Sequence, residues 1–110
     1  MKIMALDIFI ANSHGNVEKS IPLFYNDYDK MMSFIETDSF FSLLQSIFAD
    51  YYGESEVYLD ELDLLKTESL AMQEQFQSLF SEGVANFIGS FFDIIDYAVR
   101  NRKTIKLVGD

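Results

Sequence analysis

Hydrophobic and polar positions follow two different periods along the chain, and the change of period separates predicted strands from predicted helices. Residues 3–10 form a run of β-branched and aromatic side chains that is too short for a helix, which predicts a strand with most of both faces covered. Residues 12–16 are a cluster of Asn, Ser, His and Gly, which is typical of a turn. Residues 17–21 predict a return strand that Pro22 ends, so the N-terminal part is expected to form a hairpin.

From about Asp27 onward, apolar side chains recur every three or four residues, which is the helical period. The first segment of this kind predicts a short helix up to Glu36. Thr37 and Asp38 are suitable N-cap residues for a second helix, and Gly53 is placed to end that helix in a left-handed conformation. The apolar stripe of the second helix contains Phe40, Phe41, Leu44, Ile47, Phe48 and Tyr51.

A third and longer helix is predicted from a cap at Asp60 to an end at Gly83. Ser69 interrupts its apolar stripe, which indicates a kink or a shift of the buried face. The inward residues expected there are Leu62, Leu65, Met72, Phe76, Leu79 and Phe80. A fourth helix over residues 84–101 is the most apolar and is expected to be central, with Phe87, Ile88, Phe91, Phe92, Ile94, Ile95, Ala98 and Val99 on its inward side.

The end of the chain returns to the period of a strand over residues 104–108, where Lys106 alternates with Ile105 and Leu107. Strands at both ends of a helical chain must pair with each other to satisfy their backbone groups. We therefore expect an α+β fold in a single, helix-rich domain over residues 1–110. About four helices would pack on a small sheet formed by the N-terminal strand or hairpin and the C-terminal strand.

The composition adds a large negative charge and excludes several classes of site. The chain has 18 Asp and Glu residues against 8 Lys and Arg residues, a formal net charge of −10, yet 49% of it is hydrophobic, too much for a disordered acidic tail. With no Cys and one His, it has no disulfide framework, thiol nucleophile or multi-histidine metal site. The charge argues against direct nucleic-acid binding, and no apolar run approaches the roughly 20 residues that cross a bilayer.

The acidic residues are concentrated in the middle of the chain, where residues 27–96 carry fifteen acids and only two lysines. Residues 50–65 contain no cation at all, and tyrosines are interleaved with the acids there. Clustered carboxylates steer a cationic partner, and tyrosine buries a large area with few rotatable bonds. The predicted binding residues for a basic protein are therefore Asp50, Tyr51, Tyr52, Glu54, Glu56, Tyr58, Asp60, Glu61 and Asp63. Two plainer explanations stay open, namely the preference of acids for the first turn of a helix and a solvated acidic face.

Other residues that could take part in catalysis or metal binding are interpreted as structural. His14 lies in a polar turn without an identifiable orienting partner, and is interpreted as a turn residue. The sequence Asp27-Tyr28-Asp29 opens like a calcium loop, but the remaining ligands do not follow at the required spacing. We expect neither a metal nor a cofactor. A catalytic pair of carboxylates, as in glycosidases, is an alternative that the sequence leaves open, although that chemistry needs a deep cleft.

The N-terminal part of the chain contains the run Ala5-Leu6-Asp7-Ile8-Phe9-Ile10, an acidic helical middle follows, and the chain closes with Ile105-Lys106-Leu107-Val108-Gly109-Asp110. Together these features resemble small acidic bacterial immunity proteins. Such proteins are encoded beside polymorphic toxins, notably in contact-dependent growth inhibition loci. The resemblance implies a cytoplasmic protein that is not an enzyme. Such a protein binds the C-terminal domain of one cognate toxin, a basic domain such as a DNase or RNase, and occludes its active site. It carries over no functional residues, because the group shares no catalytic motif. The alternatives are an acidic adaptor or regulatory module of another kind and a small carboxylate-based hydrolase.

Overall fold

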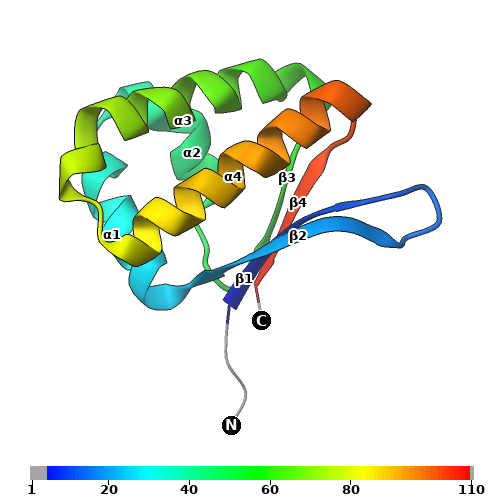
Figure 1. Cartoon of the computed structure of the whole chain (residues 1–110), viewed down its shortest axis with the longest axis horizontal. Coiled ribbons are helices and arrows are strands. Elements are labelled where there is room, and N and C mark those ends of the chain that lie inside the picture. The colour runs from blue at the N-terminus through cyan, green and yellow to red at the C-terminus, as the bar shows by residue number, and fades with distance from the viewer. Residues whose placement is uncertain (1–4, 110) are drawn as a thin grey trace, which may run out of the picture.

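In the computed structural model, which describes residues 5–109, four α-helices pack against one face of a four-stranded antiparallel sheet (Figure 1). The strands are β1 (Ala5–Ala11), β2 (Val17–Phe24), β3 (Glu54–Val57) and β4 (Ile105–Gly109). The helices are α1 (Tyr25–Ile35), α2 (Ser42–Ile47), α3 (Leu62–Phe76) and α4 (Glu82–Asn101). The predicted α+β class, with about four helices on a small sheet, is therefore confirmed. Residues 3 and 4 of the predicted first strand lie outside the described residues.

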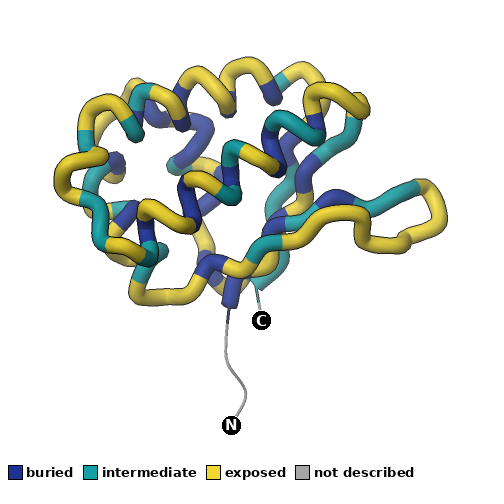
Figure 2. The backbone as a smooth tube through the Cα atoms, in the orientation of Figure 1, coloured by how far each residue is buried: buried dark blue, intermediate teal, exposed yellow. Residues whose placement is uncertain are grey.

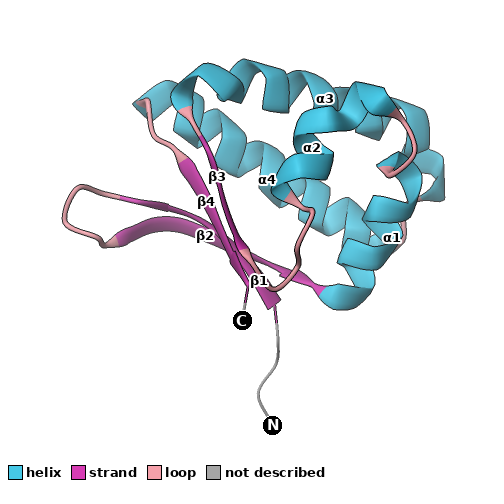
Figure 3. Ribbon diagram, turned by 180° about the vertical axis from the view of Figure 1, so that it is seen from behind, coloured by secondary structure: helices cyan, strands magenta, loops and turns pink. Residues whose placement is uncertain are grey.

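The first and last strands form the centre of the sheet, whose strand order is β2-β1-β4-β3. Ile8 of β1 lies opposite Ile21 of β2 on one side and opposite Leu107 of β4 on the other. The predicted pairing of the two ends is confirmed, because each strand supplies backbone partners that the other needs. Seen from behind, β3 lies beside β4 and completes the sheet (Figure 3).

Strand β3 is not predicted from the sequence, because only Val57 among its four residues is apolar. It forms where β4 would otherwise present an unpaired edge to solvent. Glu54 lies opposite Val108, and Val57 lies opposite Ile105. The register therefore buries one apolar side chain of β3 and leaves its acids at the outer edge of the sheet.

The expected role of Gly53 as a left-handed helix terminator is wrong. Helix α2 ends at Ile47, and Gly15 is the glycine with a positive φ within residues 5–109. Gly53 instead leads into β3, and its carbonyl accepts a hydrogen bond from the Gly109 N–H at 2.8 Å. The glycine thus joins the start of β3 to the end of β4.

Strand β2 runs through Pro22 to Phe24, so the prediction that Pro22 ends the strand is wrong. Pro22 lies opposite Asp7 in the ladder between β2 and β1. Because β2 is an edge strand, a missing N–H on its solvent side removes no ladder hydrogen bond.

The junction between α3 and α4 lies earlier than the predicted end at Gly83. Helix α3 ends at Phe76, a short 3₁₀ turn follows, and the Ser81 hydroxyl caps α4 by accepting a hydrogen bond from the Val84 N–H at 3.2 Å. Gly83 therefore lies in the first turn of α4. The Asp27 carboxylate lies so close that a Cβ atom at this position would have to displace it.

Asp60 was expected to cap α3, and this prediction is also wrong. It lies inside a 3₁₀ turn (Leu59–Glu61) that precedes the helix. The Glu61 carboxylate performs a capping role instead, because its Oε1 accepts a hydrogen bond from the Tyr58 N–H at 3.0 Å.

The buried face of α3 is continuous, so Ser69 marks no shift of that face. Leu65, Ser69 and Met72 are all fully buried within one unbroken helix, as expected for positions spaced three and four residues apart. Three side chains that were expected to point inward are exposed: Phe40 in the 3₁₀ turn (Ser39–Phe41) before α2, Leu79 in the turn after α3, and Val99 on α4.

A buried carboxylate on α3 caps the start of α2. Glu68 is 1% exposed, and its two oxygens accept hydrogen bonds from the N–H groups of Leu43 at 3.2 Å and Leu44 at 2.9 Å. The predicted cap at Asp38 is present one turn earlier, where its side chain accepts a hydrogen bond from the Phe40 N–H at 2.9 Å. The backbone donors at the start of the helix are thus shared between a local and a tertiary acceptor.

One face of the sheet carries no helix. The prediction that most of both faces of β1 are covered is wrong, because Asp7 is exposed and Phe9 is only half-buried. Most of β2 and the turn of the hairpin are exposed (Figure 2). The alternate residues of β1 point toward the helices and are fully buried, namely Leu6, Ile8 and Ile10. The molecule is accordingly flat, with extents of 39 × 37 × 21 Å.

Candidate protein-binding surface

The predicted binding segment, residues 50–63, follows the outer edge of the sheet. It starts in the turn after α2, forms β3 and ends in the first turn of α3. Eight of its nine predicted residues are exposed or half-buried. We call these eight the β3 strip: Asp50, Tyr52, Glu54, Glu56, Tyr58, Asp60, Glu61 and Asp63.

The register of β3 places two of its acids on the uncovered face of the sheet. Glu54 lies opposite Val108 and Glu56 lies opposite Lys106, and directly opposed residues project from the same face. The intervening β4 residue, Leu107, is buried under the helices, which assigns Lys106 and Val108 to the uncovered face. A shallow hollow of about 310 Å³ lies there, lined by Glu54, Ser55, Glu56, Tyr58, Lys106 and Val108.

The acids of the strip form no ion pair with any described residue. Two ion pairs occur within residues 5–109, and neither involves the strip. The carboxylates of Glu54, Glu56, Asp60 and Asp63 form no ion pair or hydrogen bond with any other described side chain or backbone group. Even Glu56, which has Lys106 as its cross-strand neighbour, forms no ion pair with it. These carboxylates are therefore available to a cationic partner.

Two other acids of the strip hold the backbone at its exposed tyrosines. Asp50 Oδ1 accepts a hydrogen bond from the Tyr52 N–H at 2.9 Å, and Glu61 does the same for Tyr58 at 3.0 Å. Such local bonds fix a turn in a single conformation. The two tyrosines, which are 57% and 56% exposed, are thus presented to solvent from ordered backbone.

Tyr51 does not belong to the surface, so its prediction as a binding anchor is corrected. Its side chain is 4% exposed, and its hydroxyl donates a hydrogen bond to the Leu23 carbonyl at 2.8 Å. The reason is that Tyr51 follows α2 with its ring directed into the core, while Tyr52, the next residue, points outward. Its ring instead supports the exposed aromatic side chains around it.

Two tyrosines of α1 join this cluster and were missed in the sequence analysis. The ring centroids of Tyr25 and Tyr51 are 5.3 Å apart, those of Tyr28 and Tyr51 are 4.8 Å apart, and those of Tyr51 and Tyr52 are 5.2 Å apart. Tyr25 is 52% exposed. The only sequence signal was the spacing of three residues between Tyr25 and Tyr28 at the start of a helix, which places both on one side.

Tyr28 connects the tyrosine cluster to the end of α2. Its hydroxyl donates a hydrogen bond to the Phe48 carbonyl at 2.6 Å. Burial raises the pKa of Tyr28, and the nearby Tyr25 and the carboxylates of Asp50 and Asp29 raise it further. The phenol therefore stays neutral, which keeps it a hydrogen-bond donor through the physiological range.

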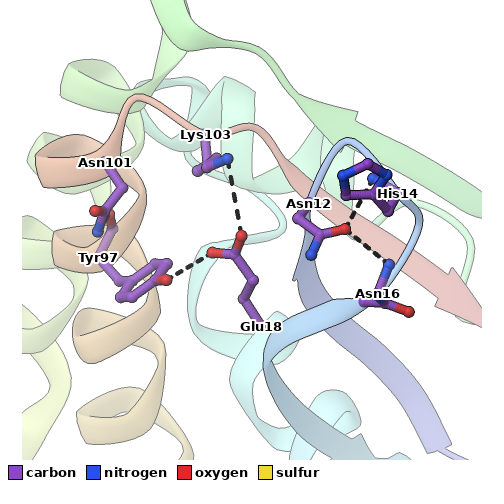
Figure 4. Close-up of polar contacts among 7 residues, drawn as sticks. All are labelled: Asn12, His14, Asn16, Glu18, Tyr97, Asn101 and Lys103. Carbon is purple, nitrogen blue, oxygen red and sulfur yellow. Dashed lines mark hydrogen bonds and ion pairs between the residues drawn. The ribbon is translucent and has the colours of Figure 1, made fainter.

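A second polar region lies where the β1–β2 hairpin meets the end of α4, and we call it the hairpin–α4 junction (Figure 4). The Glu18 carboxylate accepts a hydrogen bond from the Tyr97 hydroxyl at 2.6 Å and lies 3.8 Å from Lys103 Nζ. Lys19 Nζ is 5.3 Å from the centre of the Tyr97 ring. The hydrogen bond to Glu18 raises the pKa of Tyr97, with smaller contributions from burial and from the Glu18 charge, while Arg100 opposes the shift.

His14 lies in the turn of this hairpin, as predicted. Asn12 Oδ1 accepts hydrogen bonds from the N–H groups of His14 at 2.9 Å and Asn16 at 3.0 Å (Figure 4), and the imidazole is exposed. No group of three or more His, Asp or Glu side chains in residues 5–109 is arranged to hold a metal ion. No helix in the same part of the chain has the length and apolarity needed to span a bilayer.

Comparison of this chain with protein-family models, with curated proteins and with solved structures finds no match. The functional argument accordingly depends on the geometry and charge of the β3 strip and of the tyrosines beside it.

Proposed function

We propose that this protein is an immunity protein, which binds and neutralises a cognate basic toxin domain through the β3 strip. The observation that carries the proposal is a row of carboxylates that have no ion-pair partner among residues 5–109, next to exposed tyrosines, along the outer strand of the sheet. Such a row is costly for an isolated protein, because like charges repel. A cationic partner would convert that repulsion into attraction.

A nuclease toxin domain fits this chemistry. A domain that cleaves nucleic acid must carry Lys and Arg side chains where phosphates bind. The carboxylates of Glu54, Glu56 and Asp60 would meet those side chains with charge-assisted hydrogen bonds and keep the nucleic acid out of the active site. The toxin would act in the cytoplasm, and the inhibitor would meet it there.

The available surface is large enough for such a complex. A standard interface covers about 800 Å² on each partner, which is about an eighth of the 6413 Å² surface of this chain. The uncovered face of the sheet adjoins the strip and adds half-buried Phe9 and Val108 to it. An interface of this composition has a polar, charged rim and an apolar centre, as protein complexes commonly do.

The direct test is co-expression with the C-terminal domain of the toxin encoded beside this gene. We expect growth to be rescued and the two proteins to co-purify as a stoichiometric complex. A toxin domain from an unrelated locus is the control and should not be neutralised. Full expression of both proteins without rescue or co-purification would contradict the proposal. Co-purification with a basic protein that is no toxin would instead favour the adaptor alternative.

A further inference from the structure

We propose that Tyr25, Tyr52 and Asp50 form a receptor for one arginine side chain of the partner protein. We call these three residues the tyrosine patch. The inference deepens the proposed function, because the binding of a basic protein is taken from it. It also adds Tyr25, a residue of α1 that lies far from the β3 strip in the sequence.

The patch offers aromatic surface to a cation. Tyr25 and Tyr52 are 52% and 57% exposed, and each contacts Tyr51 at nearly a right angle, 89° and 88° between ring planes. The ring centroid of Tyr25 also lies 6.0 Å from that of Tyr28, so a part of each ring is covered and the rest contacts solvent. A cation near the face of a tyrosine ring is attracted by the ring quadrupole.

The two exposed rings are held by a rigid base. Tyr51 and Tyr28 are fixed through their hydroxyls to the carbonyls of Leu23 and Phe48. These contacts connect the patch to β2 and to the end of α2. Rings that are already ordered lose little conformational entropy when a partner binds, so more of the interaction energy appears as affinity.

The charge around the patch is complementary to a cation. The carboxylates of Asp50 and Asp29 lie close enough to Tyr28 to raise its pKa, and neither forms an ion pair with a described Lys or Arg. Three of the cations of the chain instead line a separate hollow beside α4, namely Lys19, Lys66 and Arg100. The patch therefore has no internal occupant among the described residues.

Arginine fits these features better than lysine. A guanidinium is planar and weakly hydrated, so it stacks on an aromatic ring while its N–H groups reach a carboxylate. An ammonium supplies charge alone and is more strongly hydrated. We infer that the ring of Tyr25 or Tyr52 receives the guanidinium plane and that Asp50 accepts its hydrogen bonds.

The first experiment titrates N-acetylarginine amide into the full chain at low salt and follows the aromatic and amide NMR signals. The neutral isostere N-acetylcitrulline amide and the lysine analogue are titrated in parallel. We expect the largest shifts at the rings of Tyr25 and Tyr52 and at the amides of residues 50–53, with shifts at least fivefold smaller for citrulline. Equal responses to the three probes, or shifts spread over all acidic residues, would overturn the proposal.

Matched variants then locate the site. Tyr25→Leu, Tyr52→Leu and Asp50→Asn should each weaken binding of the arginine probe at least threefold. Phe40→Leu and Glu74→Gln are the controls and should leave it unchanged, because both side chains are exposed and both lie outside the tyrosine patch and the β3 strip. Asp50→Asn keeps the oxygen that bonds to the Tyr52 N–H and so removes charge only.

Tyr25→Phe is measured together with Tyr25→Leu, because it separates a loss of arginine binding from a loss of folding. It keeps the ring and should bind the probe like the wild type. Failure of this inference is distinct from failure of the proposed function. If toxin rescue survives the double variant Tyr25→Leu, Tyr52→Leu with undiminished affinity, the arginine receptor is refuted and the immunity function stands. If the probe binds the patch but no toxin is neutralised, the receptor stands and the function fails.

Discussion

At the hairpin–α4 junction, the carboxylate of Glu18 is used inside the molecule, since it accepts a hydrogen bond from Tyr97 and lies 3.8 Å from Lys103. In the β3 strip, Glu54 and Glu56 have neither kind of partner within the described residues. Both regions lie at the ends or edges of the same sheet. They differ in whether the chain places its cations nearby.

The difference separates two uses of a carboxylate. An acid with an internal partner positions one element of the fold against another, as Glu18 does for the hairpin and α4. An acid without one adds repulsion to the folded state. Four acids of the second kind, Glu54, Glu56, Asp60 and Asp63, lie together in the β3 strip, and the proposed function gives them a partner outside the chain.

The largest expected effect is on binding. Reversing three charges of the strip, with Glu54→Lys, Glu56→Lys and Asp60→Lys, should weaken the complex with the toxin domain by about 2–5 kcal/mol, because partner cations would lose their counter-ions and face like charges. Calorimetric titration measures the loss. A control with the same change in net charge reverses three exposed acids on the helical side, at Glu36, Glu74 and Glu82. Equal losses in both variants would remove the distinction between the surfaces.

Among the acids that the fold uses, Glu68 is expected to contribute most to the free energy of unfolding. Glu68→Ala should destabilise the protein by about 2–4 kcal/mol, because two buried backbone N–H groups of α2 lose a charged acceptor. Chemical denaturation measures this change. Glu68→Gln, which keeps one acceptor oxygen, should lose less, and Glu54→Ala should stay within about 0.5 kcal/mol of the wild type. A comparable loss at Glu54 would show that the strip is structural.

Salt should affect the strip through the rate of association. We expect the association rate constant with the toxin domain to fall at least about tenfold between 50 and 500 mM salt, because screening removes electrostatic steering. Stopped-flow mixing gives the rate directly. A flat salt dependence would mean that the charge of the strip does not guide encounter.

The smallest expected effect is a change in the pKa of Tyr97 at the hairpin–α4 junction. Glu18→Gln should lower the pKa of Tyr97 toward its ordinary value, because the acceptor of its hydrogen bond loses its charge. In the wild type, the raised pKa contributes stability below about pH 10, the ordinary tyrosine pKa, and this contribution is lost as the pH rises through the folded-state value. NMR titration of the Tyr97 ring carbon follows the ionisation. An unchanged titration in Glu18→Gln would assign the shift to another cause.

Periodicity located the helices well because burial on one side of a helix imposes it directly. The stripe of α4 from Phe87 to Ala98 was read correctly, and so was the local cap at Asp38. The errors fall at boundaries and edges. Gly53 and Gly83 were assigned to helix ends because glycine is common there, whereas one leads into a strand and the other relieves a contact with Asp27.

Only part of the candidate site could be predicted from the amino-acid sequence. The acids of residues 50–63 were visible as a run, but their grouping on an edge strand required β4 as a partner. Tyr51 was placed on the wrong side, because a tyrosine in an acidic segment gives no sign that its hydroxyl reaches the Leu23 carbonyl. Tyr25 and Tyr28 were missed because ring contacts across 26 and 23 positions leave no periodic trace.

The amino-acid sequence by itself determined the class of fold, the pairing of the terminal strands and the excess of acids in the middle of the chain. These properties follow from local periodicity, from backbone hydrogen bonding and from composition, none of which needs coordinates. Tertiary structure alone decided which acids gain partners. Glu68 was drawn into the core by two N–H groups of α2, whereas Glu54 and Glu56 were left on the uncovered side of the sheet. The reason is that a carboxylate is stabilised by whatever donors lie within about 3 Å of it, and those donors come from distant parts of the chain.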